Sequence, residues 1–261
     1  MKITSIKSHV LRYELDKELG YSQQYYKHRT AHLVEVETDE GITGWGECFG
    51  PGNIALANKY VVEKVIQPLI KGDDPLNKEY IWHKVYNLLR DSGQKGMPIQ
   101  ALSGIDIALW DILAKKANLP LYQLLGGKTN DKIPVYGYGM MLQKKPVEEL
   151  CELFKNEANQ IKEKNFKAMK MKIGMGPKKD LKLVSAVRDA IGSEFKLMVD
   201  ANHAYNKNDA LYVGRGLDEM NIYWFEEPVA LEDYDGYKAV SYTHLRAHET
   251  GRNLVCRLLL E

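Results

Sequence analysis

The sequence predicts an α+β domain followed by part of a βα barrel. Three observations support this prediction: strand-like alternation near the N-terminus, a later alternation of short apolar runs with helical patterns, and polar side chains at the ends of those runs. Alternating strands and helices are typical of parallel βα units. The C-terminal ends of barrel strands open onto one face, where active sites form. We therefore expect a barrel-type enzyme.

The N-terminal domain is expected to span residues 1–128. Val34–Glu37 alternates, and the turn signal Thr38–Gly41 leads into Ile42–Glu47, which predicts an antiparallel sheet. The segment Leu19–Arg29 is polar and aromatic and contains a glycine. It predicts a mobile loop able to hold a polar ligand, with a solvated surface loop as the alternative. Helices are predicted near residues 54–70, 75–90 and 98–117.

The second domain is expected to span residues 129–240, after a glycine-containing linker at 126–131. Strands are predicted near 135–139, 168–173, 197–202 and 222–226, with helices near 147–164, 179–191, 209–220 and 232–239. These four βα units are about half of a closed eight-stranded barrel.

Residues 241–261 do not continue this pattern, which stops at Val240 without a predicted fifth strand. The segment resembles a translated sequencing-adapter read-through, so we expect a non-native tail and exclude it from the fold. His244, His248 and Glu249 are accordingly not interpreted as ligands. An ordinary amphipathic C-terminal segment is the alternative.

Composition indicates a soluble globular protein that acts on a small molecule. The 261 residues are 44% apolar, and 36 basic and 35 acidic side chains leave a net charge of +1, which favours neither nucleic acid nor an anionic membrane. We find no apolar run of about 18 residues and no apolar signal core, and we expect a cytoplasmic protein. The three cysteines are widely spaced and give neither a disulfide framework nor a zinc site.

Lys170 and Lys172 are candidate catalytic residues. Residues i and i+2 of a strand share a face, so both side chains point into the barrel if either does. Like charge and partial burial lower the pKa of a lysine, which would allow one of the two to act as a base near neutral pH. Two solvated lysines on an exposed edge strand are the alternative.

Carboxylates stand at the ends of the next two predicted strands. Asp200 and Asn202 share a face after a buried apolar run, and a buried carboxylate needs compensation, for which a divalent cation with oxygen ligands is one solution. Glu226 and Glu227 are adjacent, so we expect only one of them to enter the barrel interior. Helix capping or a structural salt bridge is the alternative for either glutamate.

The order Lys-x-Lys, Asp-x-Asn, Glu-Glu-Pro at successive strand ends resembles the mandelate racemase and muconate lactonizing branch of the enolase superfamily, over residues 1 to about 240. The resemblance implies a capping domain on a modified TIM-type (β/α)7β barrel, of which this chain carries about the first half. It implies Lys172 as the proton-abstracting base and Lys170 as its neighbour. Asp200 and Glu226 correspond to two of three Mg²⁺ ligands.

The same resemblance implies substrate contacts and a substrate class. Asn202 and His203 are placed to hydrogen-bond substrate, and Tyr25, Lys27 and His28 are candidates in the N-terminal loop. Gly44–Pro51, Leu89–Gly96 and Ala101–Asp111, together with Asp200–His203 and Trp224–Val229, are similar to galactarolactone cycloisomerases of this branch.

This similarity implies Mg²⁺-dependent abstraction of the proton α to a carboxylate in a sugar acid or lactone, leading to cycloisomerisation. An acid-sugar dehydratase is the close rival. Oligomers are common in the family, so a homo-oligomer of the full-length protein is expected by analogy only.

The chain also departs from the family pattern. The third metal ligand and the later acid/base histidine have no counterpart before Val240, so we expect an incomplete site and little or no activity from the chain as written. Two further hypotheses stay open. One is a Schiff-base aldolase that uses Lys170 or Lys172 without a metal, and the other is a non-catalytic fragment that binds or assembles with a partner.

Overall fold

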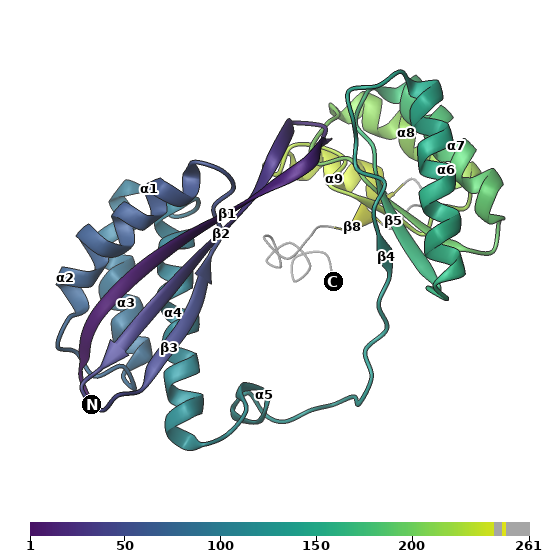
Figure 1. The fold of residues 1–261 in the computed structure, drawn as a ribbon. Helices are drawn as coiled ribbons and strands as arrows, with labels where there is room; N and C mark the ends of the chain where they lie inside the picture. Colours follow the sequence, from purple (N-terminus) through teal and green to yellow (C-terminus); the bar gives the residue numbers. More distant parts are fainter. Residues whose placement is uncertain (243–246, 249–261) are drawn as a thin grey trace. The chain divides into compact units, whose positions relative to one another are not determined.

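The computed structural model describes residues 1–242 and 247–248, and its chain forms two compact units (Figure 1). Unit 1 contains Met1–Asp16 and His28–Lys132. Unit 2 contains Lys17–Lys27 and the chain from Ile133 onward. The domain boundary near residue 128 stays a prediction, since this division also assigns an N-terminal segment to unit 2.

The core of unit 1 lies between a three-stranded sheet and a layer of helices. The sheet has the order β1 (Ile3–Tyr21), β2 (Gln24–Thr38), β3 (Thr43–Cys48), and β2 pairs antiparallel with β3. The expected α+β arrangement of an antiparallel sheet followed by helices is thus confirmed. The helices are α1 (Ile54–Tyr60), the π-helix η1 (Val61–Ile66), α2 (Gln67–Ile70), α3 (Lys78–Leu89), the 3-10 helix η2 (Arg90–Ser92), α4 (Met97–Ala117) and α5 (Leu121–Leu124).

The loop predicted at Leu19–Arg29 is wrong, because most of this segment belongs to the long strands β1 and β2, joined by a turn after Tyr21. The backbone at Gly20 is extended because it exchanges two hydrogen bonds with Leu142, at N···O distances of 2.7 and 3.0 Å. A Cβ at position 20 would lie 2.4 Å from the ring of Tyr25, so only glycine fits there. This hairpin end is the part of β1 and β2 that packs within unit 2.

Helix α4 lies directly on β3. A Cβ at Gly44 would lie 2.2 Å from the carbonyl oxygen of Ala108, so the two backbones are in close contact. Among the described residues, α4 is the one helix long and apolar enough by composition to cross a membrane. The sequence analysis did not identify such a segment. Its apolar stripe, which includes Ile105 and Leu109, is buried in the core of unit 1, as expected for the core helix of a globular domain.

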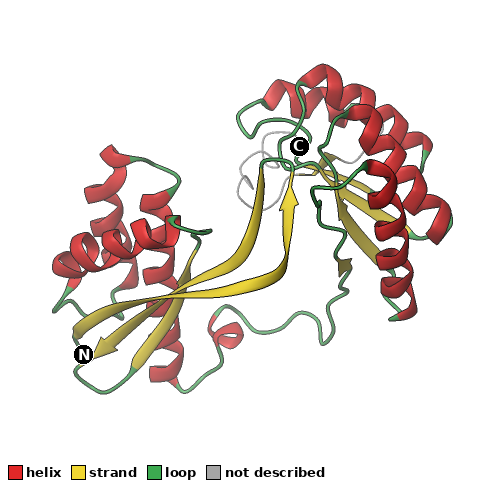
Figure 2. Cartoon of the chain, turned by 45° about the horizontal axis from the view of Figure 1, so that its top comes forward, coloured by secondary structure: helices red, strands yellow, loops and turns green. Residues whose placement is uncertain are grey.

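Unit 2 contains a parallel sheet with the order β4-β5-β6-β7-β8, and helices α6, α7 and α8 lie along one face (Figures 1 and 2). This is the βα arrangement predicted from the sequence, and the fold class is confirmed. The strands are β4 (Gly137–Tyr138), β5 (Ala168–Lys172), β6 (Lys196–Asp200), β7 (Trp224–Glu226) and β8 (Ala247–His248), and the helices are α6 (Val147–Glu163), α7 (Pro177–Ile191), α8 (Lys207–Glu219) and α9 (Tyr234–Ser241).

The expectation that no strand follows Val240 is wrong for two residues, because Ala247–His248 pairs in parallel with Phe225–Glu226. Without β8, the edge of β7 would carry unpaired backbone groups, which this pairing satisfies. Ser241 and Tyr242, the first two residues of the predicted tail, lie at the end of α9. Residues 243–246 and 249–261 lie outside the described residues. The origin of the tail stays a prediction.

Candidate active site

The strand register places charged side chains of β5, β6 and β7 in one row. Lys172 is opposite Asp200, and Asp200 is opposite Glu226, at the C-terminal ends of three neighbouring parallel strands. Lys170 precedes Lys172 by two residues and therefore shares its face. All four side chains are at least nine-tenths buried. The sheet thus gathers the two predicted lysines and the two predicted metal ligands.

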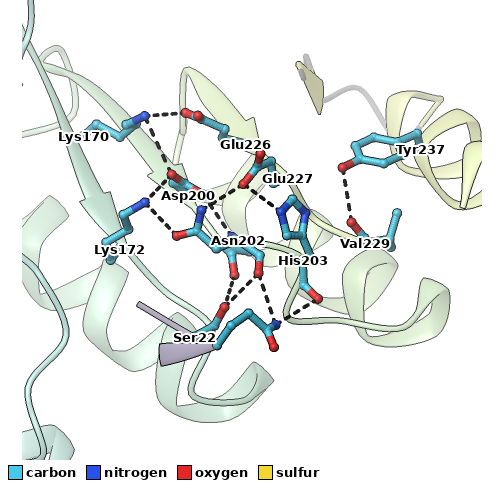
Figure 3. A network of polar contacts seen from close by, with 12 residues as sticks. Ser22, Lys170, Lys172, Asp200, Asn202, His203, Glu226, Glu227, Val229 and Tyr237 are labelled. Carbon is cyan, nitrogen blue, oxygen red and sulfur yellow. Dashed lines mark hydrogen bonds and ion pairs between the residues drawn. The ribbon is translucent and has the colours of Figure 1, made fainter. Parts of the chain in front are cut away.

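The four charges pair with one another (Figure 3). The Nζ of Lys170 donates to Oε2 of Glu226 at 2.6 Å, and it lies 3.7 Å from Oδ2 of Asp200. The Nζ of Lys172 donates to the same Asp200 oxygen at 2.5 Å. Because each buried ammonium has a carboxylate partner, the row carries no net charge.

The expectation that burial and like charge lower the pKa is wrong for Lys170. Burial alone would lower the pKa of Lys170, but the hydrogen bond and charge of Glu226, with the charge of Asp200, raise it above the usual value. The pKa of Glu226 is also raised, mainly by burial and then by repulsion from Asp200. In this arrangement Lys170 is a stable ammonium.

A second set of polar side chains lies beyond the strand ends. The amide of Asn202 accepts from Nζ of Lys172 at 2.6 Å and donates to Oε2 of Glu227 at 2.8 Å. That glutamate oxygen lies 3.3 Å from Nε2 of His203. The predicted contact residues Asn202 and His203 therefore join the site.

The expectation that only one of Glu226 and Glu227 points inward is wrong. Glu227 has a φ of 47°, and Asn202 and His203 also have positive φ, so the strict alternation of a strand ends before these residues. Both glutamates are buried and both join the polar network.

The hairpin end of β1 and β2 supplies contacts that the sequence analysis did not identify. The Oγ of Ser22 donates to the carbonyl oxygens of Ala201 and Asn202 at 2.8 and 2.9 Å. The Nε2 of Gln23 lies 3.2 Å from the Asn202 carbonyl oxygen. The hairpin end therefore packs on the backbone that carries Asn202.

The three candidates from the predicted loop lie on β2. Tyr25 is half-buried against the core of unit 2, with Nζ of Lys144 5.3 Å from its ring centroid. Lys27 is exposed, and His28 belongs to unit 1. Among the described hydrogen bonds and ion pairs, neither Tyr25 nor Lys27 contacts the charged row, so their role in substrate binding stays a prediction.

Three tyrosine rings near the lysines were also missed. Nζ of Lys170 lies 5.5 and 5.6 Å from the ring centroids of Tyr136 and Tyr138. Nζ of Lys172 lies 5.8 Å from Tyr138 and 5.9 Å from Tyr21. These distances are typical of cation–π contacts. The spacing of Tyr136 and Tyr138 on a predicted strand could have identified both, since i and i+2 share a face.

Asp200 and Glu226 fit a hard divalent cation as part of its ligand set. Their carboxylates are neighbours in register, and burial together with repulsion from Asp200 raises the pKa of Glu226, a repulsion that a cation would relieve. The part of the chain that the structure describes has no group of three or more Asp, Glu, His or Cys side chains able to hold a metal. These two residues would therefore supply two protein ligands.

Comparison with known proteins agrees with this class of fold, an α+β N-terminal domain followed by parallel βα units. The profile "Mandelate racemase / muconate lactonizing enzyme, N-terminal domain" matches residues 20–126, and "Enolase C-terminal domain-like" matches residues 153–254. The chain belongs to the mandelate racemase and muconate lactonizing branch of the enolase superfamily.

Three relatives illustrate the range of this family. The chain is 41% identical to D-galactarolactone cycloisomerase of Agrobacterium fabrum over 92% of its own length and 62% of the relative. It is 37% identical to arabinonate dehydratase of Saccharolobus solfataricus, over 77% of its own length and 53% of that relative. A racemase structure from Streptomyces coelicolor with bound magnesium is 30% identical to the chain, with a TM-score of 0.83. The match covers 92% of this chain and 66% of the racemase. The chain thus spans about three fifths or less of these curated relatives.

Proposed function

We propose that this site removes the proton α to a carboxylate in a sugar acid or its lactone, and that the reaction continues as a cycloisomerisation. The observation that carries the proposal is the row in which Lys170 and Lys172 face Asp200 and Glu226 at the ends of three adjacent strands. The similarity to D-galactarolactone cycloisomerase supports the substrate class.

The residues take separate roles in this proposal. Lys172 acts as the neutral amine, in which Nζ receives the proton and becomes an ammonium, and the ammonium of Lys170 binds the substrate carboxylate. Asn202, which already contacts Nζ of Lys172, orients that amine. Asp200 and Glu226 would hold a Mg²⁺ ion, which would supply positive charge to stabilise the negative charge that develops as the proton leaves.

The expected low activity of residues 1–261 stays a prediction. Two carboxylates give a weak Mg²⁺ site, because a small hard cation then keeps most of its water ligands. Both carboxylates also already accept hydrogen bonds from lysines. We expect at most slow turnover, even with millimolar Mg²⁺.

An acid-sugar dehydratase is the second candidate, and it shares the first step. The contact between His203 and Glu227 favours it, since a histidine held by a carboxylate beside the site could protonate a leaving hydroxyl group. The similarity to arabinonate dehydratase points the same way.

Solvent exchange tests the shared step. The protein is incubated in D₂O with millimolar Mg²⁺ and a panel of aldonates, aldarates and their lactones, and deuterium at the α carbon is measured by mass spectrometry. We expect incorporation that chelator abolishes and that Lys172→Ala lowers by at least about 100-fold. Lys196→Ala, at an exposed lysine on β6, is the matched control.

The products separate the candidates. A ring-opened isomer without loss of water supports cycloisomerisation, and loss of water supports the dehydratase. No deuterium from any member of the panel would overturn the proposal for this chain. Borohydride trapping that is insensitive to chelator would instead indicate the Schiff-base aldolase. The raised pKa of Lys170 disfavours this residue as the aldolase nucleophile.

The remaining proposals concern partners and place. We propose a small-molecule partner and a cytoplasmic location. The nearly balanced charge supports the small-molecule partner, since it gives no broad field to attract nucleic acid or a membrane surface.

A further inference from the structure

A buried aspartate lies beneath the strand-end loops and has no place in the proposed chemistry. Asp180 of α7 has no exposed surface, and its carboxylate accepts four hydrogen bonds. The backbone N–H groups of Gly174 and Met175 donate to Oδ1 at 3.0 Å each, and that of Gly176 donates to Oδ2 at 2.8 Å. These donors form the loop that directly follows Lys172.

The fourth donor comes from a different loop. The hydroxyl of Tyr205, in the segment between β6 and α8, donates to Oδ2 of Asp180 at 2.8 Å. A carboxylate in the first turns of α7 that folds back on the preceding loop explains the three backbone donors, but this does not require a buried tyrosine from the neighbouring βα unit. Burial, together with the charge of Asp180, raises the pKa of Tyr205 well above its usual value, so the hydroxyl stays protonated and donates.

Tyr205 is itself fixed to the third strand end. Its backbone N–H donates to the carbonyl oxygen of Pro228 at 3.2 Å, and it forms a parallel bridge with Val229. Its ring packs edge-on against Phe225, with 6.2 Å between centroids. The hydroxyl and the backbone of Tyr205 together therefore connect the loops after β5, β6 and β7.

The loop after β5 is also held from the other side. Gly174 has a φ of 113°, and a Cβ there would lie 2.5 Å from the Cβ of Ser22 and 2.9 Å from that of Ala204. The N–H of Ile173 donates to the carbonyl oxygen of Asp200 at 3.0 Å. The backbone on the C-terminal side of Lys172 therefore has little room to move while Asp180 holds it.

We propose that Asp180 and Tyr205 are positioning residues that hold Lys172 at the end of β5, level with Asp200. Their importance for catalysis rests on the proposed function, in which Lys172 is the base. The clamp itself does not, because it is defined by hydrogen bonds among described residues.

Lysine footprinting tests the clamp without relying on turnover. Native protein is treated with a limiting amount of an acetylating ester, and labelling at each lysine is measured by mass spectrometry. Tyr205→Phe keeps the ring and three of the four hydrogen bonds to Asp180, so the variant is expected to fold. Loss of one buried hydrogen bond predicts about fivefold more labelling at Lys172, a smaller increase at Lys170 and no change at Lys196.

Hydrogen exchange of the backbone provides the second readout. In Tyr205→Phe, the amides of Gly174, Met175 and Gly176 are expected to exchange about fivefold faster. Tyr237→Phe is the matched control, because it removes a tyrosine hydroxyl that donates to the carbonyl oxygen of Val229 at 3.2 Å, outside the clamp. It should leave Lys172 labelling unchanged.

The outcomes separate positioning from general stability. An increase confined to Lys172 and the Gly174–Gly176 amides supports the proposal, whether or not the solvent-exchange assay shows activity. Unchanged Lys172 labelling overturns it. An equal increase at Lys170 and Lys172, with faster exchange of backbone amides throughout unit 2, also overturns it, since that pattern means that Tyr205 stabilises the whole unit.

Discussion

Removal of the Arg188 guanidinium should destabilise unit 2 strongly, although no carboxylate pairs with it in the described hydrogen bonds. Arg188 on α7 is buried, with 7% of its surface exposed. Its Nε donates to the carbonyl oxygen of Met220 at 2.9 Å, and Nη2 donates to that of Asn221 at 2.8 Å. Nη1 donates to the carbonyl oxygens of Gly192 and Phe195 at 2.8 and 2.7 Å. One side chain thus joins the turns that precede β6 and β7.

The expected magnitude follows from these contacts. Four bonds of 2.9 Å or shorter, at about 1 kcal/mol net each, predict a loss of about 4 kcal/mol for Arg188→Met. Methionine retains much of the aliphatic volume, so the cavity contribution should be small. Arg188→Lys keeps a positive charge but loses the planar fork, and a loss of about 2 kcal/mol is expected.

Hydrogen exchange in increasing urea gives the free energy of unfolding for unit 2 alone, which suits a chain with two units. Peptides that cover β6 and β7 report on the turns that Arg188 joins. Arg215→Met, at an exposed arginine on α8, is the control and should change stability by less than about 0.5 kcal/mol. Equal unfolding free energies for Arg188→Met and this control would refute the reasoning.

Three further predictions concern unit 1. Burial lowers the pKa of His32, so the unfolded chain binds a proton at higher pH than the folded chain does. The contribution of His32 to stability is therefore full above about pH 6.5 and declines at lower pH. His32→Leu should flatten this decline, as measured by urea melts at pH 7.5 and 5.5. Burial raises the pKa of Cys48 to about 12, so iodoacetamide at pH 8 should label it only after unfolding, and rapid labelling of the native protein would contradict this. A Cβ at Gly46 would lie 2.0 Å from a carbonyl oxygen of α4, so Gly46→Ala should cost about 3 kcal/mol or more, whereas Gly41→Ala, with open space around it, should cost about 1 kcal/mol in thermal melts.

Sequence periodicity was sufficient to predict which residues form the charged row. The two-residue period of strands placed Lys170 and Lys172 on one face, and the βα pattern placed Asp200 and Glu226 on neighbouring strands, as the register now shows. These features depend on regular backbone. The periodic rule therefore held wherever the residue lay inside a strand.

The features of the site that the sequence did not predict depend on irregular backbone and on contacts between distant segments. Glu227 turns inward because its φ is positive, which no two-residue period predicts. Ser22 reaches the carbonyl oxygens at positions 201 and 202 from a hairpin end nearly 180 residues earlier in the chain. The pKa of Lys170 depends on a partner 56 residues away, so its direction could not be read from the neighbouring Lys172 alone.

The pairing in the charged row explains how unit 2 can bury these groups at all. An isolated buried charge is costly, and removing one member of a buried pair leaves the other uncompensated. Lys170 with Glu226 and Lys172 with Asp200 sum to zero, so the sheet can form around all four groups. In the proposed reaction, substrate and cation would therefore have to compete with contacts of 2.5 and 2.6 Å inside the protein. When the ion pair between Lys172 and Asp200 is broken, other contacts must determine where the amine of Lys172 lies. The hydrogen bonds of Asp180 and Tyr205, which we propose hold Lys172 level with Asp200, therefore matter most in that state.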